Sequence, residues 1–168
     1  MDSGVIDLLL RWTHLFGILI WVGHNYASVV QRPSYRPLCA DDLVTPDSPR
    51  MTALLGREHG TFRWAAVVTL ASGFGMLALR GWLPGALRLE GGLAPIGIGM
   101  YLGTFMVLNL WLVLWPHQKK LLGFVPASIE ERLRCSRITH LSSRTNTMLS
   151  IPTLFFMAAG SHGGALFG

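Results

Sequence analysis

The sequence predicts an all-α integral membrane protein, a four-helix bundle forming one domain over residues 1–168. The first observation is composition: 51% of the residues are hydrophobic and 14% are charged, with a mean hydropathy of +0.42. A soluble domain of this length needs more charge to cover its surface. The second observation is four apolar stretches of about 20 residues, the length that crosses a hydrocarbon core. The third is the distribution of basic residues.

The four predicted spans are separated by polar and turn-forming segments, and they cover residues 5–30, 61–82, 93–115 and 144–167. Pro49 is placed to open a helix in the first connection. Ser128 and Glu131 form a capping-box pattern that predicts a short amphipathic helix toward His140. The run Trp115-Pro-His-Gln-Lys-Lys120 predicts a helix stop followed by a basic anchor.

The N-terminal segment reads as a retained first span. Asp2 and Asp7 stand where a signal peptide carries basic residues, and the apolar run is too long for the core of such a peptide. Cys39 and Cys135 lie in connections without the spacing of a metal or redox motif. No disulfide is expected, because both connections are predicted to be cytoplasmic.

Lys and Arg are concentrated on one side of the predicted membrane. Of the 14 basic residues, all but Arg11, Arg80 and Arg88 lie in or beside the first and third connections. The positive-inside rule places those connections in the cytoplasm and both termini outside, on the periplasmic face of a bacterial inner membrane. The net charge of +5 is thus explained by lipid topology, and no nucleic-acid partner is expected.

Histidines within the spans are the main functional signal, because an ionisable side chain in a membrane helix is costly unless it has a partner. His14 lies nine residues from the outer end of the first span, and His162 lies five from the outer end of the fourth. Their depths agree within about 6 Å at 1.5 Å per residue. His14 and His162 are therefore predicted to hold one haem from opposite sides.

A second, inner pair is formed by His24 and His59, whose depths match less well. His24 lies about 15 Å along the helix from His14 and about 80° around it, so one broad face presents both. His117 and His140 fall at the membrane interface, where an ordinary solvated histidine is expected.

Haem b fits this histidine pattern, as one or two groups, because neutral imidazole commonly binds haem iron. Glycines in the spans give room for a flat ligand, and Arg11, Arg63 and Arg144 are candidate partners for its propionates. A copper site built from the inner histidines is an alternative, since imidazole also suits copper. No hydrolase, phosphate-binding or dinucleotide-binding motif is found in the sequence.

Three stretches resemble one known bacterial family. They are Arg11-Trp-Thr-His14 with Ile20-Trp-Val-Gly23, Ile96-Gly-Ile-Gly-Met-Tyr-Leu-Gly103 running to Asn109 and Trp115-Pro-His-Gln-Lys-Lys120, and Ser143-Arg-Thr-Asn-Thr-Met-Leu-Ser-Ile-Pro-Thr-Leu-Phe-Phe-Met157. The family is the membrane domain at the N-terminus of the cytochrome-c-linked urate oxidases, of which short stand-alone members exist. The resemblance covers nearly the whole chain and implies electron transfer near a c-type cytochrome at the outer face.

The sequence departs from that family at several of its histidines. His24 and Asn25 stand where bulky apolar or aromatic residues are usual, His117 stands where Asn is usual, and His59 is a further candidate departure. The C-x-x-C-H motif of an appended cytochrome c domain is missing from the sequence. These differences favour haem binding over urate oxidation.

The leading hypothesis is therefore a haem b electron-transfer subunit of a larger respiratory or photosynthetic membrane complex, more a relay than a complete enzyme. Its expected partners are lipid, other membrane subunits, a quinone or dehydrogenase, and a periplasmic carrier such as a c-type cytochrome. One alternative is a urate-oxidising subunit coupled to cytochrome c. A second is a cofactor-free structural or assembly subunit in which the histidines only donate and accept hydrogen bonds.

Overall fold

The computed structural model describes residues 3–31, 36–45, 48–56 and 60–161. These residues form helices joined by short connections, with no strand in the described ranges. The first half of the chain contributes α1 (Ser3–Asn25), which continues as a π-helical turn over Tyr26–Val30, then α2 (Ala40–Val44), α3 (Pro49–Leu55), α4 (Thr61–Leu79) and α5 (Leu83–Leu87). The second half contributes a 3-10 turn at Gly91–Leu93, α6 (Ala94–Leu108), a π-helical segment at Asn109–Leu114, α7 (Trp115–Leu121) and α8 (Ile129–Ser161).

Three helices in the described ranges are long and apolar enough to cross a membrane, namely Ser3–Val30, Thr61–Leu79 and Gly91–Leu121. They confirm the first three predicted spans by length and composition. Large apolar side chains are exposed on them, including Phe16 and Leu112. Such surfaces suit a lipid bilayer, where apolar side chains face hydrocarbon and the backbone hydrogen bonds stay inside each helix.

The predicted helix stop at Trp115-Pro116 is wrong, because the helix continues to Leu121. Proline removes one backbone donor and clashes with the preceding turn. Here Pro116 falls in the first turn of α7, directly after the π-helical segment Asn109–Leu114. A π-helical turn changes the hydrogen-bond register and gives the proline ring room without ending the helix.

The fourth predicted span lies within a longer helix than expected. α8 joins the predicted amphipathic helix to residues 144–161 of that span without a break, and residues 162–167 lie outside the described ranges. Ser128 caps α8 as predicted, since its hydroxyl accepts a hydrogen bond from the Glu131 backbone N–H at 3.2 Å. Pro49 also occupies the first turn of α3, with Ser48 as its cap.

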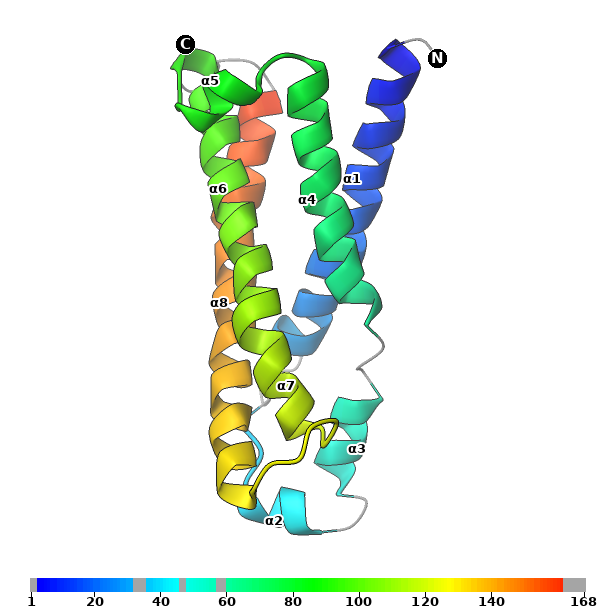
Figure 1. Ribbon diagram of the computed structural model, residues 1–168, viewed down its shortest axis with the longest axis vertical. Coiled ribbons are helices and arrows are strands. Elements are labelled where there is room, and N and C mark those ends of the chain that lie inside the picture. Colours follow the sequence, from blue (N-terminus) through cyan, green and yellow to red (C-terminus); the bar gives the residue numbers. More distant parts are fainter. Residues whose placement is uncertain (1–2, 32–35, 46–47, 57–59, 162–168) are drawn as a thin grey trace.

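The long helices form two pairs, in which α1 packs mainly on α4 and α6 mainly on α8 (Figure 1). Glycines allow close approach within each pair. A Cβ atom at Gly17 would lie 2.2 Å from the Thr69 hydroxyl of α4, and one at Gly160 would lie 2.3 Å from the Ile96 side chain of α6. We call the end of the bundle at which α5 joins the pairs the α5 end, and the opposite end the α2 end (Figure 1).

Toward the α2 end the two pairs meet in a closed core. Trp21, Phe62, Ala65, Ala66, Met106, Val107, Leu110 and Leu114 form its apolar cluster. A polar network joins the π-helical segment and α6 to α8: Asn109 Nδ2 donates to Asn146 Oδ1 at 2.8 Å, and Asn146 Nδ2 donates to the Met106 carbonyl at 3.1 Å. Hydrogen bonds of this kind hold membrane helices together where the hydrophobic effect gives no drive.

Candidate cofactor site

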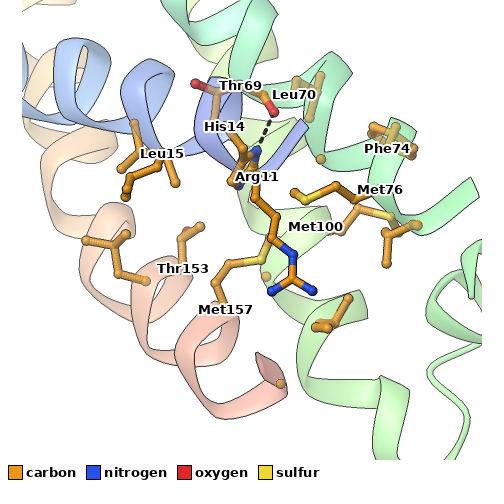
Figure 2. Close-up of a pocket in the computed structure, with 18 of the residues that line it drawn as sticks. Arg11, His14, Leu15, Thr69, Leu70, Phe74, Met76, Met100, Thr153 and Met157 are labelled. Carbon is orange, nitrogen blue, oxygen red and sulfur yellow. Dashed lines mark hydrogen bonds between the residues drawn. The ribbon is translucent and has the colours of Figure 1, made fainter. Parts of the chain in front are cut away.

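A cavity of about 540 Å³ opens between the two helix pairs, with walls from α1, α4, α6 and α8 (Figure 2). Its lining is mostly apolar, and its polar groups are few. His14 and Arg11 enter from α1, Thr69 from α4, and Ser150 and Thr153 from α8. A concave apolar space with a few polar groups is the usual form of a ligand site, and the volume falls within the ordinary range of about 300–1,000 Å³.

His14 is held in one orientation by a backbone carbonyl. Its Nδ1 lies 2.8 Å from the Thr69 carbonyl oxygen and 3.3 Å from the Ser72 hydroxyl. A carbonyl only accepts, so Nδ1 carries the proton and Nε2 keeps its lone pair. This is the arrangement found in metal-binding histidines, whose second nitrogen donates to a carbonyl or carboxylate. His14 can therefore act as a neutral nitrogen ligand.

The imidazole of His14 packs against Gly73 of α4. We call the surface that such a glycine leaves for a side chain of the neighbouring helix a seat. A Cβ atom at Gly73 would lie 3.0 Å from His14 Cε1 and 3.3 Å from Nδ1, a distance at which one of the two groups must move. The Ser72 hydroxyl donates to the Val68 carbonyl of its own helix at 2.7 Å, which leaves its lone pairs directed away from that bond. Gly73 and Ser72 thus contact the ring on its Cε1 and Nδ1 side, and not at Nε2.

Charged groups from α1 and α4 line the α5-end side of the cavity. Asp7 accepts hydrogen bonds from Arg11 Nε at 2.7 Å and from Arg80 Nε at 2.9 Å. Two guanidinium groups share this one carboxylate, and both arginines line the cavity. The group therefore has a net positive charge and spare donors, which suits the carboxylate or phosphate of an amphiphilic ligand.

An indole N–H beside the cavity lacks an acceptor. Trp21 lines the cavity with only 4% of its surface exposed. Its Nε1 is buried with no hydrogen-bond partner within the ranges that the structure describes. A buried donor without an acceptor costs free energy, on the order of 1–3 kcal/mol.

Thioethers are the other notable lining groups, contributed by Met76, Met100, Met106 and Met157. Met157 of α8 lies across Gly99 of α6, where its Sδ would be 3.2 Å from a Cβ atom. Nothing in the sequence distinguishes these methionines, because a methionine in a membrane span is ordinarily a packing residue. Asp7 and Arg80 are 73 positions apart, so no sequence pattern predicts that they meet at one site.

The inner histidine pair is only partly described. His24 stacks on Phe62, with ring centroids 4.0 Å apart and planes at 1°, and the cavity beside it has a volume of about 60 Å³. His59 lies outside the described residues, as does His162 of the outer pair. Neither predicted pairing is therefore tested. The small volume beside His24 gives room for about one or two waters and not for a macrocycle.

The remaining predicted residues have other surroundings. The Arg63 guanidinium lies 3.4 Å from the centroid of the Trp115 ring, which links α4 to α7 through a cation–π contact. Arg144 is exposed on α8. His117 Nδ1 donates to the Val113 carbonyl of its own helix at 2.6 Å. Burial and the nearby Arg144 lower the pKa of His140, so this residue is neutral at physiological pH.

In the described ranges no cluster of three or more His, Cys, Asp or Glu side chains could hold a metal ion. Cys39 and Cys135 are free thiols, as predicted. No model of a known protein family matches the chain, and no curated protein or solved structure matches it. The resemblance to the membrane domain of the urate oxidases stays a prediction from its motifs.

Proposed function

We propose that this protein is a membrane electron-transfer subunit that binds one haem b in the cavity between its helix pairs, with His14 as an iron ligand. The observation that carries the proposal is the imidazole of His14, whose Nδ1 is fixed by the Thr69 carbonyl at 2.8 Å beside a cavity of about 540 Å³. When bound, haem supplies an iron that takes up and releases one electron.

The residues present fit this cofactor. Apolar side chains such as Leu70, Phe74 and Leu77 suit the faces of the macrocycle. Gly73 of α4 and Gly99 of α6 carry no side chain, which leaves room for His14 and Met157 at the cavity. Arg11, with its Nε on Asp7, has further donors for a propionate.

Each residue would have a separate task in this site. The Thr69 carbonyl fixes the proton on Nδ1, which would leave Nε2 as the ligating nitrogen and raise its basicity. The apolar walls exclude water, which lowers the cost of reorganisation when the charge of the site changes by one. Asp7 with Arg11 and Arg80 sets the local potential, because one negative and two positive charges lie together near the cavity.

The proposed topology has four crossings, with residues 144–161 of α8 as part of the fourth. The uneven distribution of Lys and Arg supports a periplasmic α5 end and periplasmic termini in a bacterial inner membrane. The cavity then lies in the periplasmic half of the bilayer. That position favours exchange with a periplasmic carrier such as a c-type cytochrome, and the electron donor would be a quinone or a dehydrogenase reached through other membrane subunits.

The test is the haem content of the protein purified from haem-replete cells. A reduced-minus-oxidised spectrum should show a haem b alpha band in the wild type, and His14→Ala should lose most of it. The matched control is His117→Ala, which removes a histidine whose Nδ1 is bonded to its own helix. If no haem copurifies with the wild type, or if His14→Ala keeps the full band, the proposal fails.

A further inference from the structure

Each helix pair holds one ligand-type side chain against a glycine of its partner helix. In the first pair, His14 of α1 lies on Gly73 of α4, with Cε1 3.0 Å from a Cβ atom built there. In the second pair, Met157 of α8 lies on Gly99 of α6, with Cγ and Cε both 3.1 Å and Sδ 3.2 Å from such an atom. Both side chains line the same cavity.

The two seats lie at nearly the same depth in the bundle. α4 ends and α6 begins at the α5 end (Figure 1). Gly73 precedes Leu79, the last residue of α4, by six positions, and Gly99 follows Ala94, the first residue of α6, by five. At 1.5 Å per residue these positions are about 9 and 7.5 Å from the helix ends. His14 from α1 and Met157 from α8 both line the cavity at this level (Figure 2).

We propose that Met157 is the second axial ligand of the iron, opposite His14. This inference rests on the proposed function, because it concerns the same site. Histidine with methionine is a known axial pair for haem iron, and the thioether raises the reduction potential relative to a second nitrogen ligand. Both ligands are neutral, and the described lining of the cavity contains no Asp, Glu or Cys. A neutral pair therefore avoids burying a further negative charge in the membrane.

Two other side chains compete for this position. His162 is the partner predicted from the sequence, and it lies outside the described residues. Met100 also lines the cavity and is 4% exposed. It belongs to the apolar cluster of Leu77 and Ala86, against which Met157 also packs, but it comes from α6. Met157 is the thioether contributed by the helix that faces α1 across the cavity, and its sulfur rests on a glycine.

Carbon monoxide binding to the reduced protein tests the assignment, since it requires an open position on the iron. The purified wild type should not bind carbon monoxide. Met157→Leu should keep its haem and gain carbon monoxide binding, as seen by a shift of its Soret band. Met157→His should remain closed to carbon monoxide and show a lower midpoint potential. Met148→Leu, on the exposed surface of the same helix and outside the cavity lining, is the matched control and should behave as wild type.

The outcomes separate the ligand assignment from the proposed function. If the wild type contains haem and Met157→Leu stays closed to carbon monoxide, Met157 is not a ligand. Carbon monoxide binding on His162→Ala or Met100→Leu instead would assign the position to that residue and overturn the inference. If Met157→Leu loses its haem, retention in Met157→His supports ligation, and loss in both variants overturns it. A wild type without haem overturns the proposed function itself.

Discussion

The two ends of the bundle differ in how the space between the helix pairs is filled. At the α2 end, apolar side chains fill the space between the helix pairs, and Asn109 and Asn146 form a hydrogen bond within the α6–α8 pair. At the α5 end, the same pairs leave a cavity of about 540 Å³ whose few polar groups include His14 and Arg11. A cavity of this size forfeits packing energy unless something fills it. The contrast supports the proposed ligand site at the α5 end and places the tighter packing at the α2 end.

The largest effect on stability is expected at a glycine contact within a pair. The Cβ of the valine in Gly17→Val would lie 2.2 Å from the Thr69 hydroxyl oxygen and 3.2 Å from the Ala65 carbonyl oxygen. We expect a loss of about 1–3 kcal/mol, because α1 must move away from α4. Gly23→Val on the same helix is the control, since nothing lies within 4 Å of a Cβ there. Equal thermal stability of the two variants in detergent would contradict close pairing of α1 and α4.

A smaller effect is expected from the polar network at the α2 end. Asn146→Leu removes the interhelical hydrogen bonds to Asn109 and to the Met106 carbonyl, while Asn109 keeps its bonds to Ser142 of α8. The expected loss is about 0.6–1.7 kcal/mol, the range for hydrogen bonds between membrane helices. Thr145→Val is the control, because the Thr145 hydroxyl bonds only to the Leu141 carbonyl of its own helix at 3.0 Å. Unfolding by denaturing detergent measures the difference, and a destabilisation of Thr145→Val as large as that of Asn146→Leu would refute the network's role.

At the α5 end, a glycine substitution should reduce haem binding more than it reduces stability. Gly73→Ala forces the His14 ring away from its seat, with only 3.0 Å to Cε1. We expect a loss of haem content greater than the loss of thermal stability of the haem-free protein. Gly75→Ala is a matched control, because its Cβ would meet Leu10 at an ordinary 3.4 Å. If Gly73→Ala and Gly75→Ala hold equal amounts of haem, the seat is not required for the site.

The smallest effect concerns the α2 connection, outside the spans. The Cys39 backbone N–H, the Cys39 thiol and Arg50 all donate to Asp42, and these bonds lower the pKa of its carboxyl group. The pKa of Asp42 is lower in the folded protein than in the unfolded chain. Its contribution to the free energy of unfolding is therefore fully present above the unfolded pKa and is lost as the pH falls through the folded pKa. For this solvent-screened group we expect at most about 1 kcal/mol. Asp42→Asn should remove that acid dependence from the melting temperature, and Asp41→Asn should leave it intact.

The sequence predicted most of the fold because lipid imposes simple rules on it. Length, apolarity and the positions of Lys and Arg located the first three spans and gave an expected topology. The stop at Pro116 was misplaced, because a π-helical turn that accommodates proline has no clear sequence signature. α8 was divided in two, since its polar first half and apolar second half look like separate elements although no Gly or Pro interrupts residues 129–151.

The candidate site was predicted less fully. His14 and Arg11 were found, because ionisable residues in a span are rare enough to stand out. The Thr69 carbonyl could not be predicted, since every residue has one and only the helix packing selects it. Met157 has no distinguishing pattern in the sequence, and its importance comes from the Gly99 surface beneath it. Arg63, predicted as a propionate partner, contacts the Trp115 ring, and its predicted role stays a prediction.

The pairing of the helices also sets an order of events during synthesis. α1 and α4 leave the ribosome first and can associate as a hairpin through Gly17 and Thr69. The cavity does not yet exist at that stage, because α6 and α8 supply its other walls. α8 follows α6 in the chain, so the cavity cannot close until α8 has been translated. A bound group can therefore be enclosed only once the second hairpin has packed against the first.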